Sequence, residues 1–287
     1  MSVKPAAQVA PRRMPVATDL SPRAGRGVRR ATRLAQQHQA QLDAMHVLPP
    51  GLSVELAAAA HAAFDAHLTC FAGRGPTQRM IRSGTPATEI TGEAAKRSAG
   101  LIIVGAHEQH RLAGAFLGST PENLVRLSRI PILVVRGSKP DPYRTVVLAV
   151  EPSPVSAHAA QFGSALTPSA DHIVSHVTVV VGETLMRMCG VTEPQIAQLR
   201  QVSTGQARDD IGRLAATLVP APTAVEVEGG HPSTRLLELC HRYGADLIVV
   251  GNTGTRSGVG YALLGRVAQQ VLKQARCNVL IVSTAAE

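Results

Sequence analysis

The sequence predicts an α/β protein that consists of two tandem doubly wound domains, each with a parallel five-stranded sheet. Two observations lead to this prediction. Short aliphatic runs alternate with longer helical patterns, and strands that are apolar along their whole length are typical of parallel sheets covered on both faces. The same motifs also occur twice in the same order, and their period of about 145 residues indicates tandem domains and not a solenoid.

The elements of the first repeat can be placed from local patterns. Val16 to Thr18 is strand-like, and Ser21-Pro22 opens a helix because Ser is a common N-cap and Pro suits the first helical position. Alanine and valine side chains at 24, 28, 31 and 35 share one face of that helix. Apolar runs then predict strands at 42–48, 80–81, 101–104 and 132–135, and helical patterns predict helices at 54–71, 89–98 and 121–128.

The repeat defines the domain boundaries. AGLIIVG at 99–105 matches GADLIVVG at 244–251, and the glycines that close them are 146 positions apart. The Gly-x-Pro segments that begin upstream at 84 and 230 are also 146 positions apart. His46 and His176 are only 130 positions apart, which places an insertion at 183–208 of the second repeat. The turn-rich GSKPDP at 137–142 separates the repeats. We therefore expect a flexible tail over 1–13, one domain over 14–139 and a second over 140–287.

The composition excludes one class of ligand and leaves another open. Trp is absent and aromatic residues make up 2% of the chain, so binding of nucleic acid by base stacking is disfavoured. The net charge of +9 lies entirely in the first repeat, since residues 1–140 carry +10 and the rest −1. Arg23, Arg26, Arg30 and Arg33 share one face of the first helix. We interpret it as a solvated face, with polyanion binding as the alternative.

The cysteines and histidines predict no metal site. Cys70, Cys189, Cys240 and Cys277 are scattered without a CxxC pair and are interpreted as buried, reduced thiols. The pairs His107/His110 and His172/His176 have suitable spacing but no nearby set of Cys or carboxylate partners. No apolar run reaches the roughly 20 residues of a membrane span, and the N-terminal stretch has no signal-like apolar region, so we expect a cytoplasmic protein.

Glycine-rich segments follow the two matched strands, where doubly wound sheets bind ligands. They read GAHEQHRLAGAFLGS at 105–119 and GNTGTRSGVGYALLGR at 251–266. In this position they resemble the G-x2-G-x9-G-(S/T) loop of the universal stress protein family, and ATDLSP at 17–22 resembles the family's first strand end. The resemblance extends over 15–284. It implies an adenine nucleotide alpha hydrolase-like fold, with ATP phosphates and ribose on the loop and an Asp against adenine.

Carried over residue by residue, the resemblance implies two nucleotide sites, each of which departs from the pattern. Glu108 replaces the second glycine of the first loop, which brings a negative charge toward phosphate. In the second site Glu151 replaces the Asp, and the last glycine comes one residue late. Arg266 then stands in the second site where the family has a serine or threonine hydroxyl. In the first site that hydroxyl is kept as Ser119, which with Glu122 forms a predicted capping box. The candidate cofactor-binding residues are Asp19, Gly105, Gly118, Ser119, Glu151, Gly251, Gly254, Gly265 and Arg266.

These features predict a stress-response protein that acts as a sensor or regulatory module and binds ATP or another adenine nucleotide weakly, or at one of its two sites. No catalytic residue and no metal other than nucleotide-bound Mg²⁺ are predicted. A slow ATPase and a protein-interaction module without nucleotide remain alternatives. The resemblance implies pairing through the last strands, because domains of this family commonly dimerise there and a tandem chain can form that contact internally. The apolar edge strands at 132–135 and 279–282 also need cover, so we expect an intrachain pseudo-dimer, with a homodimer left open. No membrane partner is expected, and nucleic acid is disfavoured.

Overall fold

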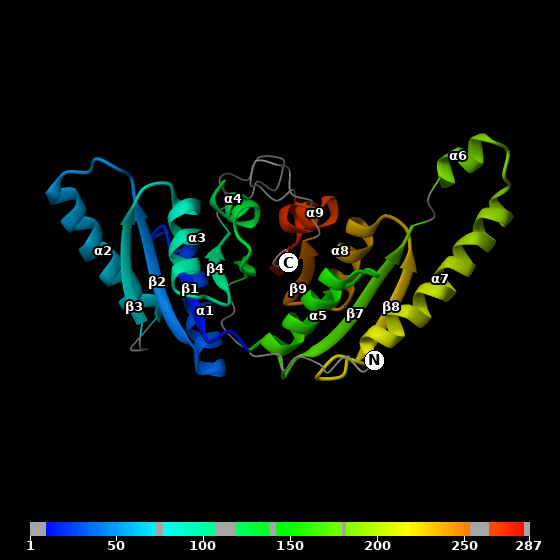
Figure 1. The fold of residues 1–287 in the computed structure, drawn as a ribbon, viewed down its shortest axis with the longest axis horizontal. Helices are drawn as coiled ribbons and strands as arrows, with labels where there is room; N and C mark the ends of the chain where they lie inside the picture. The colour runs from blue at the N-terminus through cyan, green and yellow to red at the C-terminus, as the bar shows by residue number, and fades with distance from the viewer. Residues whose placement is uncertain are drawn as a thin grey trace.

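The two halves of the chain form a single ten-stranded sheet (Figure 1). The computed structural model describes residues 10–72, 77–106, 119–137, 142–179, 182–252 and 264–283. The strand order is β3-β2-β1-β4-β5-β10-β9-β6-β7-β8, so each half contributes five parallel strands in the same order. The predicted α/β fold with two doubly wound repeats is confirmed, and its two parallel sheets are continuous with each other.

Each half alternates strands with helices. The first half contains β1 (Arg13–Ala17), α1 (Ala24–His38), β2 (Gln41–Leu48), α2 (Val54–Ala72), β3 (Thr77–Ser83), α3 (Pro86–Lys96), β4 (Ile102–Gly105), α4 (Ser119–Leu127) and β5 (Ile132–Val135). The second half contains β6 (Thr145–Ala149), α5 (Pro154–Leu166), β7 (Asp171–Thr178), α6 (Glu183–Met188), α7 (Glu193–Ala215), β8 (Ala224–Gly229), α8 (Pro232–Arg242), β9 (Leu247–Asn252), α9 (Arg266–Gln274) and β10 (Asn278–Ser283).

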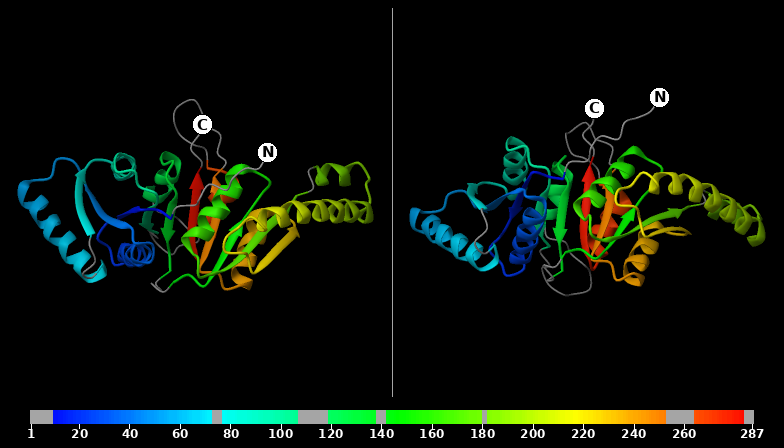
Figure 2. Two further views of the ribbon diagram at one scale, coloured as in Figure 1. Left: turned by 60° about the horizontal axis from the view of Figure 1, so that its bottom comes forward. Right: turned by 90° about the horizontal axis from the view of Figure 1, so that it is seen from below.

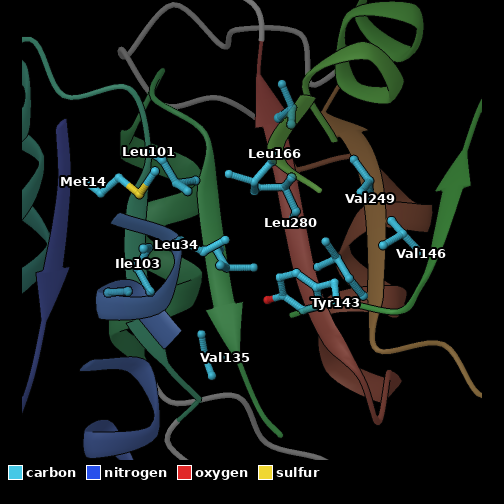
Figure 3. Close-up of a cluster of buried hydrophobic side chains, with 14 of the residues drawn as sticks. Met14, Leu34, Leu101, Ile103, Val135, Tyr143, Val146, Leu166, Val249 and Leu280 are labelled. Atoms are coloured by element: carbon cyan, nitrogen blue, oxygen red, sulfur yellow. The ribbon is translucent and has the colours of Figure 1, made fainter. Parts of the chain in front are cut away.

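Two hydrophobic clusters, one on each face of the sheet, form the core. One cluster includes Val28 of α1, Phe64 of α2 and Ala159 of α5, together with residues of the strands. The other includes Ile90 of α3 and Val271 of α9. Figure 3 shows the first cluster passing from strands of the first half to strands of the second. The aliphatic composition therefore suffices for a core that is shared by both halves.

The halves are joined by antiparallel pairing of β5 with β10, in which Leu133 lies opposite Leu280. This pairing is the one expected of an intrachain pseudo-dimer, because it covers the apolar edge of each half. A buried polar group reinforces it. The Asn278 side chain accepts the backbone N–H groups of Arg136 (2.7 Å) and Gly137 (3.1 Å) and donates to the Tyr143 hydroxyl (3.0 Å).

The first helix differs from the sequence prediction in two respects. Regular helix begins at Ala24, although the Ser21 hydroxyl accepts the Ala24 N–H (3.1 Å) as a cap would. Arg30 does not share the solvated face, because it is 5% exposed and its guanidinium lies 4.1 Å from the centroid of the Tyr143 ring. Residue 143 belongs to the segment between the halves, so contact across the joint covers a position that helical periodicity alone places in solvent.

The inserted segment of the second half folds as a helical hairpin. Helix α6 and the first part of α7 project away from the sheet (Figure 2). Arg200 of α7 pairs with Glu183 of α6, and Arg187 of α6 pairs with Glu193 of α7, so ion pairs join the two helices. The hairpin therefore adds structure to the second half without changing the order of its strands.

Candidate functional site

Two equivalent edges of the sheet bring the predicted site residues together. In the first half β1 lies beside β4 with Ala17 opposite Val104, so Asp19 and Gly105 emerge at the same edge. In the second half Ala149 lies opposite Val250, so Glu151 and Gly251 emerge together. Both edges lie at the carboxyl ends of central parallel strands where the strand order reverses, which is where doubly wound folds bind ligands.

Asp19 stands in a tight turn at the first edge. The residue is exposed, and its Oδ1 accepts the backbone N–H of Ser21 (3.0 Å). Thr18, directly before it, is buried, and its hydroxyl accepts the N–H of Leu20 (3.1 Å). These two bonds hold the aspartate at the end of β1, at the start of the connection to α1.

Two histidines lie beneath this turn. The Nε2 of His67 lies 2.9 Å from the Thr18 hydroxyl, and the Nδ1 of His46 donates to the Thr18 carbonyl (2.8 Å). His67 is 7% exposed, and this burial lowers its pKa, while the charge of Asp19 acts in the opposite direction. His67 was missed in the sequence because its partner is 49 positions away and nothing in the alanine-rich pattern of α2 marks it.

The second edge has a different environment. Glu151 is exposed, and its Oε1 accepts the hydroxyl of Ser153 (3.2 Å). His176 donates to the carbonyl of Val150 (2.8 Å), as His46 does at the first edge. Residue 150 has no hydroxyl, so the Thr–His contact of the first edge has no equivalent here. The backbone is repeated in the two halves, but the buried polar groups are not.

Gly105 and Gly251 have a packing role in the structure. A Cβ atom on Gly105 would lie 3.0 Å from the Cα of Ala24, and one on Gly251 would lie 3.3 Å from the Cα of Ser156. Each glycine thus allows the first turn of the first helix of its half, α1 or α5, to approach the end of a central strand. Helix packing alone therefore explains why glycine occupies both positions, whether or not a ligand binds there.

The start of α9 is the most anion-compatible feature at the second edge. Gly265 occupies the N-cap position, and no side chain among the described residues caps the helix. The first turn contains no acidic residue and begins with Arg266, which is exposed. Free N–H groups and the helix dipole favour an anion at such a terminus, and the arginine adds a cation.

Asn252 fixes this terminus against the sheet and was also missed in the sequence. Its buried side chain accepts the N–H of Gly265 (3.3 Å) and donates to the hydroxyl of Ser283 (3.4 Å). Its sequence signal was a polar residue directly after an apolar strand. The equivalent position in the first half is Ala106, which cannot make these bonds.

The corresponding helix of the first half is less suited to an anion. Helix α4 begins at Ser119 and carries Glu122 in its first turn, so a negative charge stands where α9 has none. The Glu122 carboxylate lies 3.9 Å from Nζ of Lys273 on α9, which links the two halves. Of the other predicted site residues, Gly118, Gly254 and Glu108 lie outside the described residues, as does the side chain of Ser119.

The described residues contain no cluster of three or more His, Cys, Asp or Glu side chains able to hold a metal ion. His172 and His176 lie on strand β7, where His172 contacts the Thr167 hydroxyl (2.9 Å). None of the helices in the described part of the chain is long and apolar enough to span a membrane.

Comparison with known proteins agrees with this architecture. The model of the universal stress protein family matches residues 11–136 and again residues 142–283. A universal stress protein of Mycolicibacterium smegmatis is 30% identical over 295 residues, which cover 93% of this chain and 95% of that protein. One of Mycobacterium tuberculosis is 28% identical over 219 residues, or 68% of this chain and 66% of that protein.

Solved structures show the same two-half fold. A universal stress protein from Archaeoglobus fulgidus superposes with a TM-score of 0.70 at 17% identity, covering 96% of this chain and 99% of that one. A functionally unknown protein from Pseudomonas aeruginosa gives a TM-score of 0.71 at 17% identity, with 96% and 93% coverage. With two matches to the family model that together span nearly the whole chain, this protein belongs to the universal stress protein family.

Proposed function

We propose that this protein is a stress-response module that binds an adenine nucleotide, and that its second half holds the principal site. The observation that carries the proposal is the start of α9. Its N-cap is a glycine, its first turn holds a cation and no carboxylate, and Asn252 anchors it at the carboxyl edge of the sheet. These are the properties that a phosphate group needs at a helix terminus.

Electrostatics favours the second site over the first. Glu122 in the first turn of α4 opposes an anion, whereas Arg266 in the first turn of α9 attracts one. Charges near a helix terminus contribute about 0.3–1 kcal/mol each. Exchanging an unfavourable charge for a favourable one thus separates the two termini by about 0.6–2 kcal/mol, or roughly 3- to 30-fold in affinity. One nucleotide per chain is the expected stoichiometry at moderate concentration.

The test is isothermal titration of the full chain with ATP and with ADP. Arg266→Ala is expected to weaken ATP binding about 5- to 10-fold, because one phosphate-facing cation is lost. Arg208→Ala is the matched control, since Arg208 is an exposed arginine on α7, and it should leave affinity unchanged. Two equally tight sites per chain, no binding, or equal effects of the two substitutions would each refute the assignment.

The wider role rests on family membership together with this site. We propose a regulatory module, without catalysis, that acts in the cytoplasm during stress. The domain boundary near residue 139 is likewise a proposal, supported by the gap between the two segments that match the family model. Phosphate release from ATP at the background rate, unchanged by Asp19→Ala, is the expected result, and release abolished by that substitution would favour a slow ATPase.

A further inference from the structure

A row of arginine side chains runs along the exposed face of α1. Arg23, Arg26, Arg29 and Arg33 are all exposed, and they follow one another at intervals of three, three and four residues. These intervals place them on one side of the helix, over about 15 Å of its length. Arg30 is buried, and Arg29 takes the place that the sequence prediction gave to it. We call the four exposed residues the arginine stripe.

Contacts hold two of these guanidinium groups in place while occupying few of their N–H donors. The Arg29 guanidinium lies over the Phe71 ring of α2, 4.7 Å from the ring centroid, and this contact uses no N–H donor. Arg26 gives one of its donors to the carbonyl of Arg136 (3.2 Å). Among the described residues no carboxylate forms an ion pair with Arg26, Arg29 or Arg33. Their positive charges therefore remain available to a partner.

The two helices that meet at the joint on this face contain no acidic residue. Both α1 and α5 are described in full, neither contains Asp or Glu, and both pack on the same hydrophobic cluster. They approach each other at their C-terminal ends, where the side chains of Gln37 and His38 lie 3.5 and 2.8 Å from the carbonyl oxygen of Leu166. The surface of α1 and α5 therefore has no side chain that repels an anion.

Carboxylates on the other elements of the first half do not neutralise the arginine stripe. On α2, Asp65 is paired with Arg79 (2.7 Å), and Glu55 lies about 24 Å along the helix from Phe71. Asp19 stands in the turn before α1 and so offsets the first charge of the stripe at most. Helices α3 and α4 mix glutamate with lysine and arginine, and they cover the other face of the sheet. The excess positive charge of the first half is thus concentrated on the α1 face.

The chemistry of this face selects the kind of partner. The exposed large hydrophobic side chains of the described residues lie elsewhere, at 52–56, 179–202 and 219–225, so α1 offers no apolar anchor to a lipid surface. The Phe71 ring beside the stripe is covered by Arg29, which leaves it closed to base stacking by a single strand. A flexible acidic peptide would lose conformational entropy on binding, whereas a duplex presents its phosphates in a preformed row.

We propose that the arginine stripe binds the phosphate backbone of double-stranded nucleic acid without reading its sequence. Guanidinium groups match phosphate oxygens through paired N–H donors. One strand of a duplex carries a phosphate about every 3.4 Å along the axis, so the 15 Å of the stripe span about four phosphates. The sequence alone favoured a solvated face here, and phosphate contacts need none of the aromatic rings that the chain lacks. The proposal does not depend on the nucleotide site of the second half.

The experiment measures the fluorescence anisotropy of a labelled DNA duplex of about 20 base pairs, titrated with the full chain between about 50 and 200 mM KCl. Three to four phosphate contacts predict a slope of about −3 for the logarithm of the association constant against that of the salt concentration, or about 60-fold weaker binding at the higher salt. A second duplex of unrelated sequence should bind equally. A native slope flatter than about −1, or a tenfold difference between the duplexes, would overturn the proposal.

Variants test whether the arginine stripe makes these contacts. Arg26→Gln/Arg29→Gln/Arg33→Gln should reduce the slope by about 2–3 and weaken binding at about 50 mM KCl at least tenfold. Arg33→Gln alone, which removes no packing contact among the described residues, should reduce the slope by about 0.9.

The matched control is Lys96→Gln/Arg126→Gln/Arg129→Gln, which removes the same charge from exposed positions on or next to α3 and α4, and it should keep the native slope. Circular dichroism establishes that each variant is folded. Equal effects of the two triple variants would refute the role of the arginine stripe.

Two further probes test the choice of partner. A polyglutamate peptide of about 20 residues and vesicles that contain phosphatidylserine are each expected to bind at least about tenfold more weakly than the duplex, because the peptide must be ordered and the vesicle finds no apolar anchor. Binding of either probe as tightly as the duplex would overturn the assignment to nucleic acid.

Discussion

Removing the Asn278 side chain should weaken the joint between the halves. This residue is 2% exposed and satisfies three polar groups, the N–H groups of Arg136 and Gly137 and the hydroxyl of Tyr143. Each buried hydrogen bond contributes about 1 kcal/mol net, so Asn278→Ala is expected to lower the free energy of unfolding by about 3 kcal/mol. Asn252→Ala is the matched control, because Asn252 is also buried but its bonds to Gly265 and Ser283 are longer, at 3.3 and 3.4 Å.

The assay is urea denaturation of the full chain followed by circular dichroism. With an m-value of about 3 kcal/mol/M, the midpoint should fall by about 1 M in Asn278→Ala and by about 0.3 M in Asn252→Ala. A second transition at lower urea would mean that the halves separate before they unfold, and the earlier midpoint is then the one to compare. Equal shifts in the two variants, or no shift in Asn278→Ala, would refute the importance of this polar group for the joint.

Two further predictions concern stability: its dependence on pH, and the effect of alanine at two glycine positions. Burial lowers the pKa of His67 and His172, so the unfolded chain takes up these protons first. Stability should therefore decrease as the pH falls below about 6.5 and level off below the folded pKa values, and a His67→Gln/His172→Gln chain should show a flatter urea-midpoint profile against pH. Gly105→Ala should destabilise the protein by about 1–3 kcal/mol, because its Cβ would meet the backbone of α1. Gly92→Ala, on an open face of α3 with no atom within 4 Å of the new Cβ, should instead stabilise it by about 0.5–1 kcal/mol. Urea denaturation, as for the Asn278 variant, measures both glycine variants.

The repeated architecture could be predicted because it depends on local patterns. Continuous apolar segments such as Ile102–Gly105 form parallel strands that are buried on both faces, and the constant offset between repeats fixed the order of the elements. The pairing of β5 with β10 was expected from the family resemblance and from the two apolar edge strands, which can cover each other within one chain. The first strand and helix boundaries shifted by a few residues, where turns and caps compete with regular structure.

The features that could not be predicted all depend on contacts between distant residues. Arg30 lies on a helix face that periodicity assigns to solvent, and only the ring of Tyr143 explains its burial. The expectation that all four cysteines are buried was wrong, because Cys70 and Cys189 are exposed. His67 is defined by its contact with Thr18, which is 49 positions away in the sequence. No local pattern contains these pairings, because each joins elements that the fold alone brings together.

The joint explains how the two halves could diverge. Pairing of β5 with β10 uses backbone hydrogen bonds and aliphatic side chains. Its paired positions, 132–134 and 279–281, include no residue of either candidate edge. A substitution at one edge therefore need not disturb this pairing. The first edge has acquired the buried His67 and a carboxylate in the first turn of α4, while the second has acquired Asn252 and a cation. The proposed difference in nucleotide affinity between the two edges is compatible with this separation.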